Sequence, residues 1–217
     1  MKKAFTMIEL IFVIVVIGIL AAVIIPSTRT NPLQEAAIQM LSHIRYTQHL
    51  ALIDDKYGDQ GSANWKYARW QIVFTANGSS YSNYEYAYTI FSDSLSYGGD
   101  ASFGEIAKNP QNTDQIMTGG YGSGTMDITS TTFKGMKKLN LGMTYGISSV
   151  LLSGGCSGLN ITFDSFGRPY DGKHDLGAGT DTHALIPTDC NIVLKDSADN
   201  NVTITIRAET GYASIDF

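Results

Sequence analysis

The first part of the chain contains a long apolar run. MKKAFTMIELIFVIVVIGILAAVIIP has a single charged residue, Glu9, between Phe5 and Ile25. A helix over these residues extends about 31 Å, which is the thickness of the hydrocarbon core of a bilayer. The run therefore predicts one transmembrane helix, and the positive charges of Lys2 and Lys3 predict that its start faces the cytoplasm.

A removable secretory signal is the competing interpretation of this run. Signal peptides have an apolar core of about 7–15 residues and end at a small-residue cleavage site. LAAVIIPS could supply such a site near Ala21–Ser27, and the mature protein would then be secreted, for example as an enzyme. The length of the run and the charge of Glu9 favour an anchor.

The charged side chain of Glu9 is energetically unfavourable in a transmembrane helix. A charged side chain at the centre of a membrane span costs about 2.5–3.5 kcal/mol, and such residues tend to be paired. No Lys, Arg or His follows Glu9 before Arg29, which is too distant on the same helix to reach it. The partner must therefore be lipid, interfacial water or another polypeptide.

KKAFTMIELIFVIVVIGILAAVIIP resembles the start of type IV pilin and type II secretion pseudopilin precursors. That family has a basic leader, a prepilin peptidase cut before an aromatic residue, and a glutamate four residues later. The resemblance implies cleavage between Ala4 and Phe5, N-methylation of Phe5, and pairing of Glu9 with the terminal amine of a neighbouring subunit. Pairing two buried charges offsets the cost of each. Ala4 departs from the glycine that usually precedes the cut.

Gly18 and Pro26 fall where the same family often carries helix-weakening residues. Pro26 removes a backbone donor and can kink the helix. Gly18 is also explained by the ordinary tolerance of glycine in membrane helices.

The segment after STRTNP has apolar residues at helical spacing, and it predicts an amphipathic helix whose apolar face packs on the following domain. Asn31 followed by Pro32 is typical of a helix start. The helix therefore either restarts at this point or bends through Pro26 and Pro32.

From Trp65 the sequence changes to short alternating runs separated by turn residues, which predict an antiparallel sheet or sandwich. The expected fold is α+β, with a long N-terminal transmembrane and amphipathic helix packed on a C-terminal antiparallel β domain. The expected boundaries are 1–4 for the leader, 5–30 for the transmembrane helix, 31–56 for its amphipathic continuation and 57–217 for a periplasmic β-rich domain.

Two later segments, LNITFDSFGRPYDG and NVTITIRAETGYASIDF, are similar to parts of H-type minor pseudopilins and related minor type IV pilins. Those proteins have an F-x-x-x-G-x-P turn and a glycine-containing C-terminal hairpin. The corresponding residues here are Phe163, Gly167, Pro169 and Gly211. Together with the N-terminus, the resemblance covers most of the chain.

Cys156 and Cys190 are the two cysteines of the chain. Both follow the apolar segment, so the predicted anchor places them on one side of a membrane, in a compartment where a disulfide persists. We expect them to form a disulfide in preference to two unrelated buried thiols.

YDGKHDLGAGTDTHALIPTDC gathers acidic and histidine side chains. Asp171, Asp175 and Asp181 are the candidates for a metal site, because carboxylates suit calcium. The segment has neither EF-hand spacing nor a paired-ligand motif, so no metal and no other cofactor is expected.

Catalytic and nucleic-acid-binding functions find little support in the sequence. It has no G-x-S-x-G, H-E-x-x-H or phosphate-binding motif, which argues against an enzyme. The formal net charge is -5, and an acidic chain has no general attraction for nucleic acid.

The expected function is that of a structural minor pseudopilin or minor pilin of a type II secretion or type IV pilus machine. The resemblance implies a single-pass protein of the bacterial inner membrane, with its C-terminal domain in the periplasm, that later joins a pilus or pseudopilus. Its partners would be other pilin or pseudopilin subunits, prepilin peptidase and an inner-membrane assembly platform. The alternative is a singly anchored periplasmic binding module that does not polymerise and for which Glu9 is dispensable.

Overall fold

The computed structural model describes residues 6–27, 31–56, 65–94, 100–172 and 184–216. The chain divides into two compact units, Met1–Asn31 and Pro32–Phe217. The first unit contains helix α1 (Met7–Ser27), whose side chains are described as far as Leu20. The second unit is a mixed α+β domain rich in strands, in agreement with the class expected from the sequence.

The predicted transmembrane helix of residues 5–30 is wrong. Among the described residues, no helix combines the length and the apolar character needed to cross a bilayer. The localisation as a single-pass inner-membrane protein is therefore corrected too, and a second helix begins separately at Pro32.

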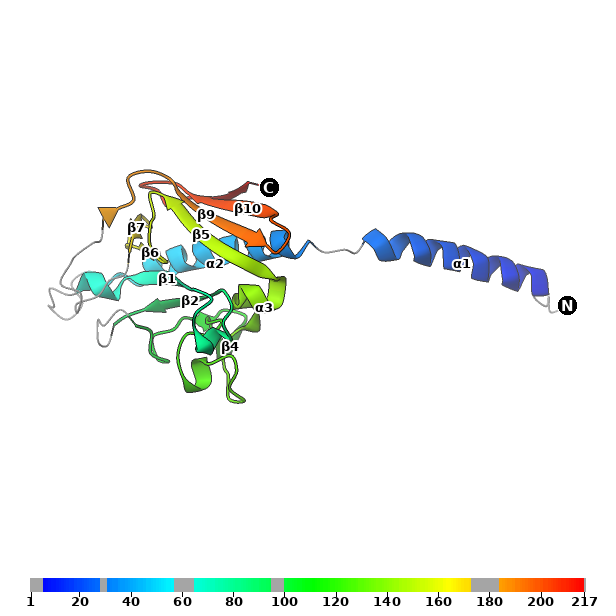
Figure 1. Ribbon diagram of the computed structural model, residues 1–217, viewed down its shortest axis with the longest axis horizontal. Helices are drawn as coiled ribbons and strands as arrows, with labels where there is room; N and C mark the ends of the chain where they lie inside the picture. Colours follow the sequence, from blue (N-terminus) through cyan, green and yellow to red (C-terminus); the bar gives the residue numbers. More distant parts are fainter. Residues whose placement is uncertain (1–5, 28–30, 57–64, 95–99, 173–183, 217) are drawn as a thin grey trace. The chain divides into compact units, whose positions relative to one another are not determined.

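Helix α2 (Pro32–Ile53) belongs to the second unit and packs against strands of both of its larger sheets (Figure 1). It begins at Pro32, where the sequence pattern predicts the start of a helix. Ala36 and Ala37 are fully buried, and their small side chains allow the helix to lie close to the strands. The buried face of α2 consists of Leu33, Ala36, Ala37, Met40, Ile44, Thr47 and Ala51.

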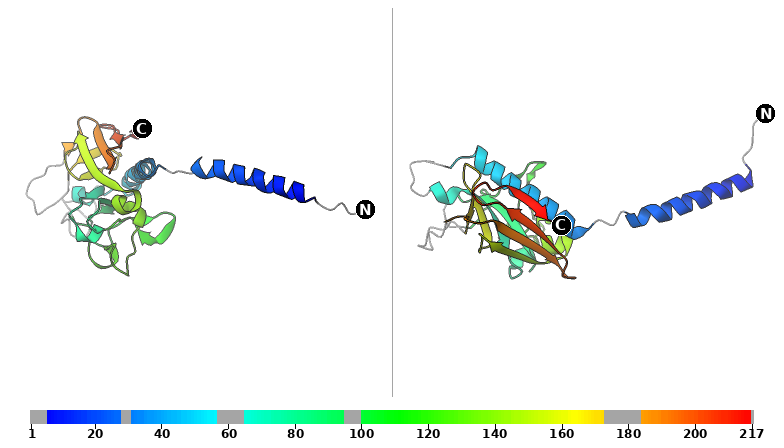
Figure 2. Two further views of the ribbon diagram at one scale, coloured as in Figure 1. Left: turned by 45° about the vertical axis from the view of Figure 1, so that its right-hand side comes forward. Right: turned by 90° about the horizontal axis from the view of Figure 1, so that it is seen from above.

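The two larger sheets are antiparallel. The five-stranded sheet has the order β2-β1-β6-β7-β8, with bounds β1 (Trp70–Thr75), β2 (Ala87–Ser92), β6 (Asn160–Phe163), β7 (Pro169–Asp171) and β8 (Ala184–Leu185). The four-stranded sheet has the order β11-β10-β9-β5, with bounds β5 (Ile147–Gly154), β9 (Cys190–Asp196), β10 (Asn201–Ile206) and β11 (Ala213–Asp216). In the left view of Figure 2, which looks nearly along α2, strands β9–β11 lie on one side of the helix and β1 and β2 on the other.

Shorter elements complete the domain. A small hairpin pairs β3 (Lys108–Asn109) with β4 (Asn112–Ile116). Helix α3 (Leu141–Tyr145) is capped by Asn140, whose side chain accepts a hydrogen bond from the backbone of Met143. The 3-10 turns are η2 (Trp65–Ala68), η3 (Ser80–Ser82), η4 (Gly124–Met126) and η5 (Lys137–Leu139).

A buried polar network joins α2, β2 and α3. The hydroxyl of Tyr88, a fully buried residue, accepts a hydrogen bond from Gln39 Nε2 at 3.0 Å and lies 2.7 Å from His43 Nδ1. The hydroxyl of Tyr145 donates to Gln39 Oε1 at 2.8 Å. Because burial disfavours the charged imidazolium, the pKa of His43 falls to about 4, and the ring is neutral near pH 7.

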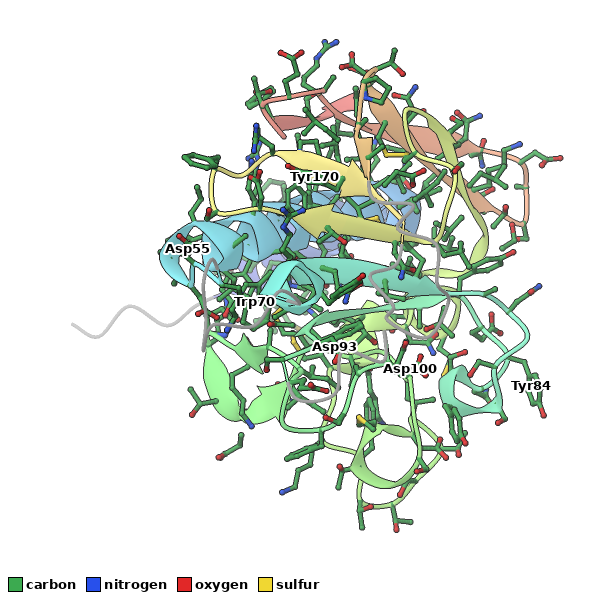
Figure 3. All side chains as sticks on the ribbon, turned by 90° about the vertical axis from the view of Figure 1, so that its left-hand side faces the viewer. Asp55, Trp70, Tyr84, Asp93, Asp100 and Tyr170 are labelled. Atoms are coloured by element: carbon green, nitrogen blue, oxygen red, sulfur yellow. A yellow bond between two sulfur atoms is a disulfide. The ribbon has the colours of Figure 1, made fainter. Side chains whose placement is uncertain are left out.

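The turn between β6 and β7 is built around Asp164. Its Oδ1 accepts hydrogen bonds from the backbone N–H groups of Phe166 and Arg168, at 3.0 and 2.9 Å. Its Oδ2 accepts from Arg168 Nε at 2.8 Å and from the hydroxyl of Tyr170 at 3.1 Å. The guanidinium of Arg69 lies 4.4 Å from the centre of the ring of Tyr170, a residue labelled in Figure 3. The polar residues of DSFGRPY therefore fix this turn.

Gln48 joins α2 to this turn and to the β10–β11 turn. Its Nε2 donates to the carbonyl oxygens of Gly167, at 2.8 Å, and of Thr210, at 3.2 Å. We call Gln48, Gly167, Thr210 and Gly211 the Gln48 junction. Gly167 has φ +77° and Gly211 has φ +68°, and a Cβ on Gly211 would overlap the carbonyl oxygen of Gly167. The glycines that the family resemblance singled out therefore meet at one place.

The predicted disulfide is confirmed. Cys156 and Cys190 are bonded, with their Cα atoms 5.1 Å apart and a sequence separation of 34. The bond ties the segment after β5 to the start of β9. Closing a loop of this length stabilises a fold by about 3–4 kcal/mol in the chain-entropy model.

The Gln48 junction predicts a strong effect of Gly211→Ala. The substitution combines a left-handed backbone with a steric overlap, and we expect it to lower the free energy of unfolding by about 1–3 kcal/mol. Urea unfolding of the whole chain measures this loss. Gly78→Ala is the matched control, because a Cβ there meets no atom within 4 Å. Equal unfolding midpoints for the two variants would contradict the steric argument.

The low pKa of His43 predicts acid sensitivity. Between pH 6.5 and about 4 the unfolded chain binds a proton at His43 that the folded chain does not bind, so stability falls as the pH falls. The loss is about 2–3 kcal/mol between pH 7 and pH 4.5. Unfolding midpoints at the two pH values should lie closer together in His43→Gln than in the native chain. His49→Gln, on an exposed position of the same helix, should leave the pH dependence unchanged.

Candidate functional site

The start of α1 is a hydrogen-bonded capping box. Thr6 directly precedes the helix and Glu9 is its third residue. The backbone N–H and the hydroxyl of Thr6 each donate to Glu9 Oε2 at 3.1 Å, and the backbone N–H of Glu9 donates to Thr6 Oγ1 at 3.4 Å. Such a reciprocal arrangement satisfies backbone donors that have no partner in the first turn of a helix.

Apolar side chains cover every side of α1, and the described ones are exposed. The exposed fraction of its large apolar residues ranges from 37% for Val16 to 84% for Met7. A helix of a globular domain usually has one apolar stripe, whereas a helix that is apolar all round is normally buried. Large exposed apolar surfaces mark sites of interaction. We therefore take the side chains from Met7 to Leu20, the α1 surface, as the candidate functional site.

Glu9 is the one ionisable group of α1. Its negative charge lies in the first turn, where it interacts favourably with the helix dipole. Oε2 receives both hydrogen bonds from Thr6, and Oε1 receives none within the described part of the chain. The carboxylate therefore keeps one oxygen available for a donor from another molecule.

The structure describes two of the four other residues predicted for the N-terminal site, Gly18 and Pro26. Ala4 and Phe5, the predicted cleavage and methylation positions, lie outside the described residues. Gly18 lies within α1, and a Cβ on it would meet no atom within 4 Å. Pro26 is part of α1, one residue before its end. Close packing in this unit therefore does not require glycine at position 18.

One of the three candidate metal ligands, Asp171, lies within the described residues. The carboxylate of Asp171 accepts hydrogen bonds from the backbone and hydroxyl of Ser157 and from the backbone of Gly158. Asp171 thus fixes the loop before β6. Asp175 and Asp181 lie outside the described residues. Within the described ranges, no group of three His, Cys, Asp or Glu side chains could hold a metal ion.

A groove of about 650 Å³ lies between β1 and the segment around residues 121–126. The hydroxyl of Tyr121 donates at 3.3 Å to Oδ1 of Asp100, a residue labelled in Figure 3. Burial raises the pKa of Tyr121, so the phenol stays neutral. The described lining contains no His, Lys, Arg or Cys. Asp100 is the one carboxylate of the described lining, and its Oδ1 accepts the hydrogen bond from Tyr121.

Sequence reasoning missed the capping box and the groove for different reasons. TMIE has the [ST]-x-x-[DE] form of a capping box at Thr6 and Glu9, so a local signal was present. The groove is lined by residues from several segments that are distant in sequence. No local pattern could have indicated it.

Comparison of the chain with protein-family models, with curated proteins and with solved structures finds no match.

The capping box predicts that Thr6→Ala weakens the first turn of α1. Loss of the hydroxyl removes the acceptor of the Glu9 N–H and costs about 1 kcal/mol of local stability. Hydrogen exchange of the Glu9 amide should therefore speed up about five-fold. Thr6→Ser retains the hydroxyl and should exchange at the native rate. Equal rates in the two variants would show that the hydroxyl does not cap the helix.

Proposed function

We propose that this chain is a structural subunit of a filament of the pilin or pseudopilin type, and that it assembles through α1. The observation that carries this proposal is the α1 surface, an exposed helix that is apolar on every side and has one carboxylate in its first turn. Burying a Val, Leu, Ile or Phe side chain is worth about 1.5–3 kcal/mol. Packing α1 against the corresponding helices of neighbouring subunits removes these side chains from water.

Glu9 supplies the charge that sets the register of the assembly. A carboxylate moved into an apolar contact is destabilising by several kcal/mol unless it is paired. Cleavage between Ala4 and Phe5 by a prepilin peptidase creates a new terminal amine, which in a neighbouring subunit becomes the partner of Glu9. Oε1, which accepts no hydrogen bond from the residues that the structure describes, is an acceptor suited to this amine. The pair forms at only one axial offset between two helices, so charge pairing selects one register.

The second unit is the part of the chain that indicates which kind of subunit it is. It has its own core, in which α2 packs on two antiparallel sheets. The Gln48 junction contains Gly167 and Gly211, two of the positions that resemble minor pseudopilins. This similarity supports a minor subunit, with other pilin or pseudopilin subunits, prepilin peptidase and an assembly platform as partners.

Glu9→Gln tests the assembly role. Glutamine keeps the size of the side chain and an acceptor oxygen but removes the charge, so the pair with a terminal amine is lost. We expect at least a tenfold loss of the subunit from sheared filaments, measured by immunoblot after co-expression with the prepilin peptidase and the other subunits. N-terminal sequencing of the native chain from the same cells should begin at Phe5.

Glu35→Gln is the matched control. Glu35 is an exposed acidic residue in the first turn of α2, and its substitution makes the same change of net charge. This variant should be incorporated normally. A binding module that does not polymerise predicts that the native chain and both variants are absent from the filaments. Normal incorporation of Glu9→Gln would refute the pairing role.

A further inference from the structure

Strand β5 forms one edge of the four-stranded sheet. It pairs with β9 from Ile147 to Gly154, and in Figure 1 it runs across the front of the domain. Within the described residues, the backbone of β5 makes no hydrogen bond on its other side. About half of the N–H and C=O groups of such an edge strand point away from its neighbour and can pair with another strand.

Within the described residues, the β5 edge has few of the features that usually protect an edge strand. Its sequence, ISSVLLSG, contains no charge and no proline. A shift of register between Ile147 and Ser149 disturbs only its first residues. The opposite edge of the same sheet, β11, differs, because it is four residues long, contains Asp216, and has its Ala213 carbonyl occupied by Arg45. Edge strands that natural proteins protect are short, charged or covered.

The side chains of β5 alternate between two faces. Val150 is buried and Leu152 is half-buried against the core. Leu151 points to the opposite face, is 51% exposed, and stands across from Val193 of β9. Ser149 and Ser153 lie on the same face as Leu151, two residues to either side of it.

We propose that the β5 edges of two copies of this chain pair antiparallel, about a twofold axis that passes through Leu151. With the axis perpendicular to the sheet, Leu151 opposes Leu151 of the second copy, Ser149 opposes Ser153, and Val150 opposes Leu152. Every pair then joins side chains of one kind. Cross-strand pairs of matched character stabilise a sheet.

The neighbouring registers lack this match. An axis through Val150 would place Ser149 opposite Leu151, and an axis through Leu152 would place Leu151 opposite Ser153. The alternation of β5 therefore favours one register. The absence of charge in the strand also means that no like charges oppose each other when it pairs with itself.

The pairing is independent of the filament proposed above. Contacts along a polar filament are head-to-tail, whereas a twofold contact closes on itself. The β5 pair therefore joins subunits that are not yet assembled, or subunits of two adjacent filaments. One strand pair buries less than the roughly 1,200 Å² of a stable interface. The dimer is therefore weak, and a covalent cross-link is needed to detect it.

Leu151→Cys traps the pair in the full chain. Both native cysteines are already in a disulfide, so the new thiol is the reactive one. Directly opposed residues have Cα atoms about 4.5–5.5 Å apart, within the range that a disulfide spans. We expect mild oxidation to give a covalent dimer on a non-reducing gel, in an amount that rises with protein concentration.

Ser153→Cys is the matched control. In the proposed register, position 153 of one copy opposes Ser149 of the second copy. The two 153 positions are then about 13 Å apart, so Ser153→Cys should not form a disulfide between the copies. Adding Ser149→Cys to it should restore the dimer through two links. Equal dimer yields from Leu151→Cys and Ser153→Cys would overturn the register, and no dimer from Leu151→Cys would overturn the pairing.

Discussion

Gln48 donates from one side-chain nitrogen to two carbonyl oxygens, and these bonds fix how α2 lies on both sheets. Gly167 belongs to the turn of one sheet and Thr210 to the turn of the other. If the donor were absent, the carbonyl of the buried Gly167 would lose its partner, which costs about 1–3 kcal/mol for a group left buried without one, whereas Thr210 is exposed to water. The close approach of Gly167 and Gly211 also requires residues without a Cβ. The hydrogen bonds and the close glycine contact together favour the observed arrangement of helix, turns and sheets.

Local signals predicted the parts of the fold that depend on few residues. Asn31-Pro32 marked the start of α2, and the two cysteines of the chain indicated the disulfide. The prediction of a membrane helix used composition and length, and the described part of α1 does not support it. The network around Tyr88 could not be predicted, because His43 and Tyr88 are 45 residues apart in sequence and nothing local indicates that they meet.

The two candidate interaction sites differ in how far the sequence indicates them. Glu9 stands out as the lone charge of an apolar run, so composition alone identifies it. The β5 edge has no comparable signature, since an alternating run of Ser, Val and Leu is equally suited to the centre of a sheet. Its position at an edge follows from the order β11-β10-β9-β5. That order is a property of the whole domain, and strand periodicity does not determine it.

At both sites, groups of the chain have no partner among the described residues, while the domain core satisfies most of its own polar groups. On α1 these groups are apolar side chains and one carboxylate oxygen, and on β5 they are backbone donors and acceptors. An apolar surface stabilises many relative orientations about equally, so it needs a charge to select one. A strand edge has the opposite property, because its hydrogen bonds are directional and fix the orientation, while its small area gives little stability. A filament needs a large buried surface with a fixed register. The combination of apolar area and a single charge on α1 meets that requirement, and β5 by itself does not.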